Sequence, residues 1–77
     1  MNTSERIKKI MSVIFETPIE SINENSSSDN IENWDSLHHL NLIVALEEEF
    51  GVSIPDDEVG NLVNFKLVEL TINELLK

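Results

Sequence analysis

The stretch DSLHHLNLIVALEEEF, residues 35–50, predicts the helix around which the rest of the chain is organised. It follows an irregular acidic loop and ends in three consecutive glutamates and a phenylalanine. Gly51 comes next, and glycine commonly ends helices because it adopts the left-handed conformation at low cost. Asp35 or Ser36 is expected to cap the helix start, because either side chain can accept a backbone N–H of the first turn. The pattern therefore predicts a helix over residues 38–50.

The apolar residues of this segment fall on two sides of the helix instead of one stripe. At 3.6 residues per turn, one side carries His39 and a set suited to a core: Leu42, Ile43, Leu46 and Phe50. The other side carries Ser36 and a second set, which we predict to be partner-binding: Leu37, Leu40, Val44, Glu47 and Glu48. The second set forms an apolar strip that is acidic at one end. If the helix packs on both sides, the strip is core instead.

The net charge of −10 and its distribution limit the partners of this chain. The few basic residues lie toward the two ends: Arg6, Lys8, Lys9, Lys66 and Lys77. Residues 11–65 contain no lysine or arginine. We therefore expect no binding to nucleic acid or to an anionic membrane surface. Basic patches on other proteins are the expected counterparts.

Length and composition predict one small domain, residues 1–77, because 77 residues suffice for one core and not for two. Cysteine is absent, which fits a reducing compartment and leaves no disulfide or thiolate metal site. The first residues do not resemble a signal peptide. The longest apolar run, residues 42–46, is far too short to span a membrane. The expectation is a cytoplasmic monomer that is not inserted in a membrane.

Three further helices are predicted from local patterns. Residues 2–15 show helical spacing of their apolar residues, Ile7, Ile10, Met11 and Ile14. Pro18 prevents this helix from continuing. Pro55 and the acids after it begin a short helix, which Gly60 keeps weak. Asn64 can cap a last helix, whose apolar face is Phe65, Val68, Ile72, Leu75 and Leu76.

A long loop over residues 18–34 separates the first predicted helix from the second. Its expected core anchors are Ile19, Ile22, Ile31 and Trp34. Loops of this length are usually functional or partly disordered, although this one could simply be the tether that two packed helices need. No segment alternates as a strand would. The predicted fold class is all-α: a small four-helix bundle with three longer helices, one short helix and a long loop between the first and second.

Three motifs in this short acidic chain resemble those of acyl carrier proteins: Asp35-Ser36-Leu37, ALEEEF at residues 45–50, and Ile54-Pro55-Asp56. The resemblance covers nearly the whole chain. It implies that Ser36 receives a 4′-phosphopantetheine arm from coenzyme A through a phosphopantetheinyl transferase, which would make the chain a phosphoprotein. Asp35 and Leu37 complete the motif. The arm would hold acyl groups as thioesters and present them to acyl-loading and acyl-transfer enzymes with basic patches, in fatty-acid, lipid or specialised metabolite biosynthesis.

The resemblance also implies an acyl pocket beside the second helix. The matching positions are Leu46, Ile54, Val59, Leu62, Val68 and Ile72, all of which would also serve as core residues.

Some positions depart from the family pattern. Asn33 stands where glycine is usual, and asparagine tolerates a left-handed backbone better than most residues. Trp34 is large, and either packs over the helix start or faces partners. His38 and Asn41 occupy positions that are often acidic in carriers of fatty acid synthesis. These departures favour a specialised stand-alone carrier, for example in lipid A, polyketide or lipopeptide pathways.

Other interpretations of the same residues compete with the carrier. Ser36 could be only a helix cap. Ser36 and His39 could suggest a nucleophile and its base, but no orienting group or oxyanion hole accompanies them, so we expect no catalytic residue. Adjacent residues on a helix point about 100° apart, so His38 and His39 are not expected to bind one ion together with Asp35. The loop before Asp35 is interrupted by Ile31 and Trp34 where a calcium-binding loop needs its regular pattern. We therefore expect no metal site. The alternative functions are a peptidyl or aminoacyl carrier and an unmodified acidic interaction module.

Overall fold

Four helices and one short turn make up the regular structure of residues 2–77, the part of the chain that this computed structural model describes. The helices are α1 (Thr3–Phe15), α2 (Ser36–Phe50), α3 (Asp56–Val59) and α4 (Phe65–Leu75), and the 3₁₀ turn is η1 (Ile19–Ser21). Within these residues no strand forms, and a single isolated bridge joins Ser27 to Asn64. The all-α prediction with three longer helices and one short one is confirmed.

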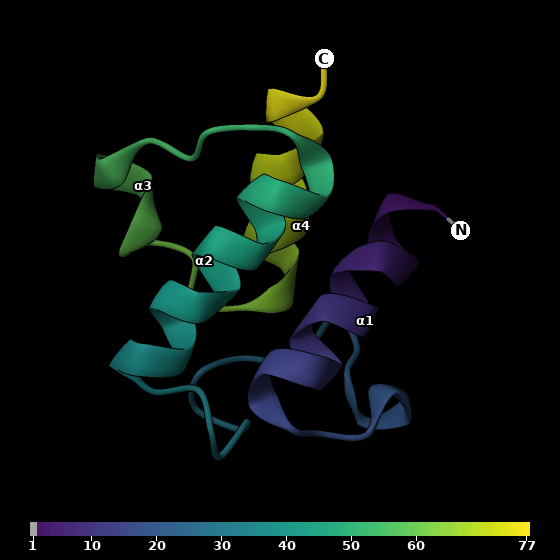
Figure 1. Ribbon diagram of the computed structural model, residues 1–77. Coiled ribbons are helices and arrows are strands. Elements are labelled where there is room, and N and C mark those ends of the chain that lie inside the picture. The colour runs from purple at the N-terminus through teal and green to yellow at the C-terminus, as the bar shows by residue number, and fades with distance from the viewer. Residues whose placement is uncertain (1) are drawn as a thin grey trace.

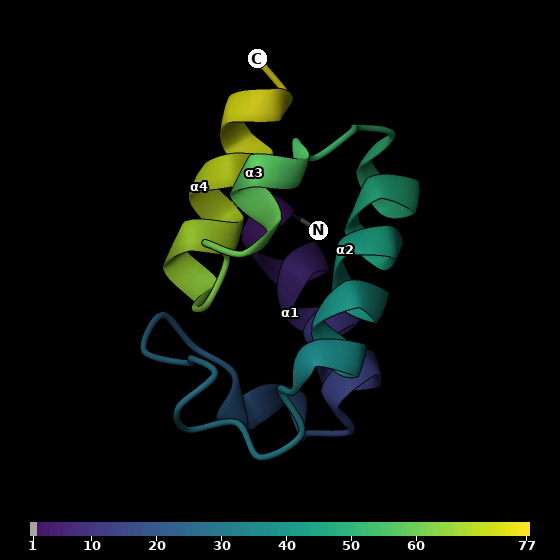
Figure 2. The ribbon, with the colours of Figure 1, turned by 90° about the vertical axis from the view of Figure 1, so that its left-hand side faces the viewer.

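The three long helices pack around one core, and the long loop closes one end of it. Figure 1 shows α2 between α1 and α3, with α4 behind it. In both views, Figure 1 and the perpendicular Figure 2, the loop between α1 and α2 runs across the end of the molecule at which α2 begins. The start of α2 therefore lies beside this loop, and His39 in its first turn contacts the carbonyl oxygen of Val59 at the end of α3. Within residues 2–77, no helix has the length and apolar character that crossing a membrane requires.

Each long helix buries one face and exposes the other, as amphipathic helices do. Three residues of each helix, spaced at most four residues apart, are buried: Ile7, Met11 and Phe15 of α1; Leu42, Ile43 and Leu46 of α2; Phe65, Val68 and Ile72 of α4. The connecting segments add the remaining core residues: Ile22, Ile31, Trp34, Ile54 and Leu62. The core predicted for α2 is confirmed, apart from half-buried Phe50 at its edge.

The helix starts are fixed by short polar side chains. The side-chain oxygens of Asn2, Asp35 and Asn64 each accept the backbone N–H three residues further on, at 2.8, 2.9 and 2.8 Å. Such caps contribute about 1 kcal/mol each, because they satisfy a donor that the helix leaves unpaired. Asp35 and not Ser36 is the cap of α2, so the helix begins two residues before the predicted start.

The helix ends follow the expected rules with one exception. Gly51 ends α2 in the left-handed conformation, with φ +64°, as predicted. Helix α1 ends in the same conformation at Glu16, with φ +51°, although a side chain disfavours it. The backbone N–H of Thr17 then bonds to the carbonyl of Ser12 at 3.1 Å, which satisfies one of the last carbonyls of the helix. Pro18 follows outside the helix.

Two residues predicted to be core are not. Ile19 is 40% exposed, because it lies on the short turn η1 and the following Ile22 takes the core position at 2% exposed. Leu76 is 45% exposed, because α4 ends at Leu75 and Leu76 forms its cap outside the regular helix. The remaining loop anchors, Ile22, Ile31 and Trp34, are buried as predicted.

The polar part of the long loop is attached to the start of α4. The backbone N–H of Ser28 donates to the carbonyl of Val63, and the N–H of Phe65 donates to the carbonyl of Ser26, both at 2.9 Å. Ser26 is 3% exposed, and its hydroxyl accepts the backbone N–H of Asn23 at 2.9 Å. The loop is therefore a backbone-paired connection that shapes one wall of the region beside Ser36.

Candidate functional site

Ser36 is the first residue of α2 and is exposed. The residue before it does the capping: an oxygen of the Asp35 carboxylate accepts the backbone N–H of His38 at 2.9 Å. The same oxygen lies 2.8 Å from His38 Nδ1. The interpretation of Ser36 as the helix cap is therefore wrong, because Asp35 occupies that position and Ser36 is the exposed residue that follows it.

The electrostatics at this helix start favour an anion. The backbone N–H of His38 holds the pKa of the Asp35 carboxyl below its usual value, and the hydrogen bond from the His38 ring adds to this effect. The unpaired N–H groups of the first turn and the helix dipole give this end partial positive charge. A phosphate attached to the Ser36 oxygen would lie in this favourable field.

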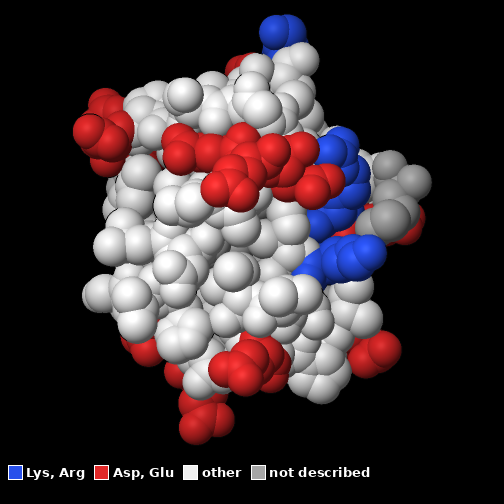
Figure 3. All heavy atoms as spheres, viewed as in Figure 1, with Lys and Arg blue, Asp and Glu red and all other residues white. Residues whose placement is uncertain are grey.

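Four of the five residues predicted to bind partners are exposed on α2: Leu37, Leu40, Val44 and Glu48. Leu37, Leu40 and Val44 are 66%, 57% and 54% exposed, so they are not core, and the alternative of a helix packed on both sides is wrong for them. Figure 3, viewed as in Figure 1, shows a broad area without charged side chains over the first part of α2, and a band of carboxylates across its last part. Glu48 is exposed as expected.

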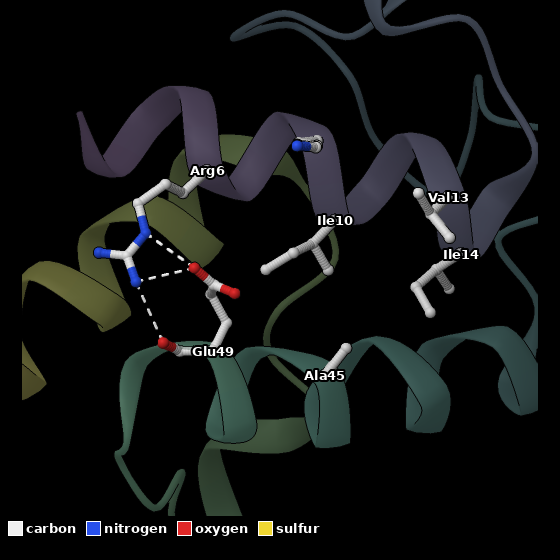
Figure 4. Close-up of a pocket in the computed structure, with 7 residues that line it drawn as sticks. Arg6, Ile10, Val13, Ile14, Ala45 and Glu49 are labelled. Atoms are coloured by element: carbon white, nitrogen blue, oxygen red, sulfur yellow. Dashed lines mark hydrogen bonds and ion pairs between the residues drawn. The ribbon is translucent and has the colours of Figure 1, made fainter. Parts of the chain in front are cut away.

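The other two glutamates of this helix have structural contacts that the sequence pattern did not indicate. The Glu47 carboxylate accepts the backbone N–H of Ile54 at 2.7 Å, which ties the end of α2 to the extended segment before α3. Glu49 pairs with Arg6 of α1 at 2.8 Å, and Arg6 also donates to the Glu49 carbonyl at 3.0 Å (Figure 4). Glu47 is half-buried, so its carboxylate is less available to a partner than that of Glu48.

A hollow of about 450 Å³ lies directly beside Ser36. Its walls come from the long loop, the first turns of α2 and the connection between α3 and α4; they include Ser28, Trp34, Ser36, His39, Leu40, Gly60 and Val63. Apolar and polar side chains are mixed in this lining. The hollow therefore offers space for a small group within reach of the Ser36 oxygen.

The six residues predicted for an acyl pocket lie elsewhere, in the core. Leu46, Ile54, Leu62, Val68 and Ile72 are at most 5% exposed, and Val59 is half-buried. None of them lines the hollow beside Ser36. Their role as an acyl pocket stays a prediction.

A second and larger hollow, about 580 Å³, lies between α1 and α2. Figure 4 shows Ile10, Val13 and Ile14 of α1 facing Ala45 of α2, with the pair of Arg6 and Glu49 at one end. The hollow is lined by no residue of the Asp35-Ser36-Leu37 motif and by no serine or threonine that could receive the arm. Size alone does not make it the functional site, so we place the site at the smaller hollow.

His39 is not positioned as a base for Ser36. Its Nδ1 accepts the indole N–H of Trp34 at 2.9 Å, and its Nε2 lies 2.7 Å from the carbonyl oxygen of Val59. Both ring nitrogens are occupied, which removes the hydrolase interpretation. Within residues 2–77, no three histidine, aspartate or glutamate side chains form a cluster that could hold a metal ion.

The residues before the motif pack inward. Trp34 is 7% exposed and its ring stacks on Phe15, with centroids 4.7 Å apart, so it packs over the helix start instead of facing partners. Asn33 does not adopt the left-handed conformation that we considered for it. Its side-chain amide instead donates to the Phe15 carbonyl at 2.7 Å and satisfies the end of α1. These contacts fix the two residues before Asp35 against the end of α1.

Comparison with known proteins identifies relatives. A family model described as "Phosphopantetheine attachment site" matches residues 5–65. The acyl carrier protein of Thermosynechococcus vestitus is 41% identical over 66 residues, covering 80% of each chain. That of Zymomonas mobilis subsp. mobilis is 42% identical over 65 residues, covering 84% of this chain and 83% of the relative. The solution structure of holo acyl carrier protein from Geobacter metallireducens superposes with a TM-score of 0.85 at 28% identity, covering 99% of this chain and 87% of that one.

Proposed function

We infer the function from one premise: the chain belongs to the acyl carrier protein family, whose members are non-catalytic carriers with a 4′-phosphopantetheine prosthetic group. We propose that Ser36 is the residue that carries this group and that Asp35 and Leu37 complete the recognition motif. The observation that supports Ser36 most directly is its exposed hydroxyl at the positive end of α2, where Asp35 does the capping.

The proposed attachment fits the chemistry of the chain. There is no cysteine, so the protein has no thiol of its own. The prosthetic group supplies a terminal thiol on which acyl groups are held as thioesters. The chain itself contributes the positive end of a fifteen-residue helix, which stabilises a phosphodiester on Ser36. It also presents the neighbouring surface to enzymes.

The test is the intact mass of the protein before and after incubation with coenzyme A and a broad phosphopantetheinyl transferase. A gain of ~340 Da is expected, the mass that the arm adds to a serine. The gain should vanish in Ser36→Ala and persist in the control Ser21→Ala, which removes another exposed serine hydroxyl. Folded protein that gains no mass would instead support the unmodified interaction module.

We further propose that the exposed side of α2 is the surface that partners recognise. Leu37, Leu40 and Val44 would make apolar contacts, and Glu48 would meet basic side chains of the transferase and of acyl-loading and acyl-transfer enzymes. Exposed charge pairs of this kind mainly set the encounter rate and the choice of partner. That suits a monomeric carrier in the cytoplasm, which must leave each enzyme after one step.

The pathway that we propose is a specialised one and not housekeeping fatty acid synthesis. The first half of α2, which begins after Asp35, contains no carboxylate. The two positions that are often acidic in carriers of fatty acid synthesis hold Asn41, which is exposed and neutral, and His38, whose ring contacts Asp35. An enzyme that binds this carrier would find its acidic contacts mainly near Glu48, one end of the helix. The direct check is the acyl group attached to the protein purified from its source; an aminoacyl group would support a peptidyl carrier instead.

A further inference from the structure

The larger hollow, between α1 and α2, has the composition of a ligand site, and the proposed carrier function does not use it. It measures about 580 Å³, and its apolar walls are Ile10, Val13 and Ile14 of α1 and Ala45 of α2. Sites for small molecules are commonly of this size, with mostly apolar walls and a few charged or polar groups at fixed places. We call this space the α1–α2 hollow.

The apolar walls of the α1–α2 hollow are incompletely covered. Val13 is 71% exposed, more than any other large apolar residue that the structure describes, and Ile10 and Ile14 are half-buried at the edge of the core. Figure 4 shows Ala45 opposite them on α2, where a single methyl group leaves space between the two helices. An apolar ligand in this space would remove apolar surface from water, which is favourable.

An ion pair closes one end of the α1–α2 hollow. Arg6 of α1 reaches across to α2, where its Nη2 lies 2.8 Å from the Glu49 carboxylate and donates to the Glu49 carbonyl at 3.0 Å. Its guanidinium also lies over the Phe50 ring, 4.4 Å from the centroid. Figure 4 shows the pair at one end of the apolar row. A space closed at one end fits a short chain better than a partner's helix, which would continue past both ends of a groove.

The charge at the α1–α2 hollow is opposite to that of the chain as a whole. Residues 1–10 contain three of the five basic residues, Arg6, Lys8 and Lys9, and only one acid, Glu5. Lys9 lines the hollow and is exposed, and no carboxylate among residues 2–77 forms an ion pair with it. Glu49 offsets Arg6 alone. The ammonium of Lys9 therefore leaves a positive charge beside apolar walls, which is the complement of an anion with an apolar tail.

We propose that the α1–α2 hollow binds a free medium-chain monocarboxylate, with the carboxylate at Lys9 and the tail between Val13 and Ala45. From Lys9 to Ile14 the helix rises by about 7.5 Å, at 1.5 Å per residue, which suits a tail of medium length. Ligands of this class are released when an acyl thioester is hydrolysed. The inference does not depend on Ser36, because no residue of the Asp35-Ser36-Leu37 motif lines this hollow.

The test is an NMR titration of the full chain with sodium octanoate, kept below the concentration at which octanoate forms micelles. Sodium acetate at equal concentration is the control, since it supplies the same ions without the tail. Octanoate should shift the backbone amides of Ile10, Val13 and Ala45 to saturation, and acetate should not. The amides of Leu40 and Val63, which line the hollow beside Ser36, should not follow. A response that does not saturate, or one centred on the core or on the hollow beside Ser36, overturns the proposal.

Three variants separate the tail site from the charge. Ala45→Leu fills the α1–α2 hollow without changing its charge and should abolish the saturable shifts. Lys9→Gln should raise the Kd for octanoate by about two- to fivefold, the effect of one exposed ion pair. Lys66→Gln removes an exposed lysine of α4, outside this hollow, and should bind like the native chain.

The exposed position of Lys9 makes its variant safe for the fold, and the spectrum of each free variant verifies folding. Folded Ala45→Leu that binds octanoate as the native chain does overturns the proposal. Equal losses from Lys9→Gln and Lys66→Gln also overturn it, because net charge and not Lys9 would then determine the affinity.

Discussion

Asp35 determines what Ser36 can do, because the start of α2 needs one capping oxygen and Asp35 supplies it. Aspartate and serine are both good caps, so the sequence left the choice between them open. The structure resolves it through the extended backbone of Asp35, with φ −106° and ψ −176°, which directs the carboxylate back over the first turn. The neighbouring hydroxyl is then exposed.

The charge of Asp35 gives a pH-dependent contribution to stability. Its pKa is lower in the folded chain than the usual value, first because of the His38 backbone N–H and then because of the His38 ring. The stabilisation is therefore complete above the unfolded pKa, about 4, and is lost as pH falls through the lower folded pKa. Asp35→Asn keeps a good cap without the charge, so urea unfolding should show a shallower loss of stability below about pH 4 than in the native chain. Equal pH slopes would contradict this.

Glu47 and Glu48 are adjacent and identical but should differ in their effect on stability. Removing the Glu47 carboxylate leaves the Ile54 N–H without its acceptor in a part-buried place. Glu47→Ala should lower the free energy of unfolding by about 1.5–3 kcal/mol, the usual range for a hydrogen bond to a charged group. Glu48→Ala, on the exposed side, should change it by less than about 0.5 kcal/mol. Similar losses from both variants in chemical denaturation would exclude a special role for Glu47.

At the scale of elements, α2 serves the core with one side and the surface with the other. Its buried residues, Leu42, Ile43 and Leu46, and its exposed strip of Leu37, Leu40 and Val44 follow directly from helical periodicity. This is why the helix and its two sides could be predicted from the sequence.

The predicted elements differ from the observed ones mainly where packing decides the outcome. Ile19 and Leu76 were predicted to be core and are exposed. Both lie at the end of an element, where apolar periodicity does not determine which residue is the last regular one. The bond from Glu47 to Ile54 and the contact of His39 with Val59 could not be predicted, because each joins two elements whose relative position no local pattern defines.

The exposed strip can be tested with matched substitutions. Leu40→Glu and Val44→Glu should leave the fold intact and slow phosphopantetheine transfer by ~10-fold or more. Each variant loses one apolar contact of about 1.4 kcal/mol with the transferase, which lowers the affinity tenfold, and at low protein concentration the transfer rate falls with the affinity. Leu70→Glu on α4 is the control, since Leu70 is 57% exposed, as is Leu40. If the α2 variants unfold, or if the control slows transfer equally, the strip is not the binding surface.

The two glycines should respond oppositely to alanine. Gly51 has φ +64°, so Gly51→Ala should lower the free energy of unfolding by about 1 kcal/mol through backbone strain. Gly60 has φ −70°, and an added Cβ there would meet no atom within 4 Å. Gly60→Ala should be neutral or raise the free energy of unfolding by up to about 1 kcal/mol, because the unfolded chain loses freedom. Urea midpoints that move in the same direction for both would contradict the assignment.

At the scale of the whole molecule, excess negative charge opposes the compact state. The net charge is −10, and some of the carboxylates form a band that Figure 3 shows across the end of α2. Only the side of the band next to α1 meets basic residues, where Arg6 pairs with Glu49. This self-repulsion could be predicted from composition alone, because it depends on the sum of charges and little on their exact positions.

Screening this repulsion should stabilise the protein. Salt at about 0.1 M shortens the range of charge interactions to about 10 Å. The melting temperature should therefore rise by about 5 °C between low and moderate salt, which corresponds to about 1 kcal/mol for a domain of this size. The exposed pair of Arg6 and Glu49 would be weakened by the same salt, but such pairs contribute little. A melting temperature that is flat or falls would show that repulsion is not the dominant charge effect.

The bonds that join Ser26 and Ser28 to Phe65 and Val63 carry a consequence for synthesis of the chain. The loop lies before α2 in sequence, yet its partners come only after α3. A nascent chain can form α1 on the ribosome from local contacts, but it cannot close this bridge until residues 63–65 have left the exit tunnel. This wall beside Ser36 can thus be completed only after α3 has been made, and a modifying enzyme that reads the wall would recognise the chain only from that point on.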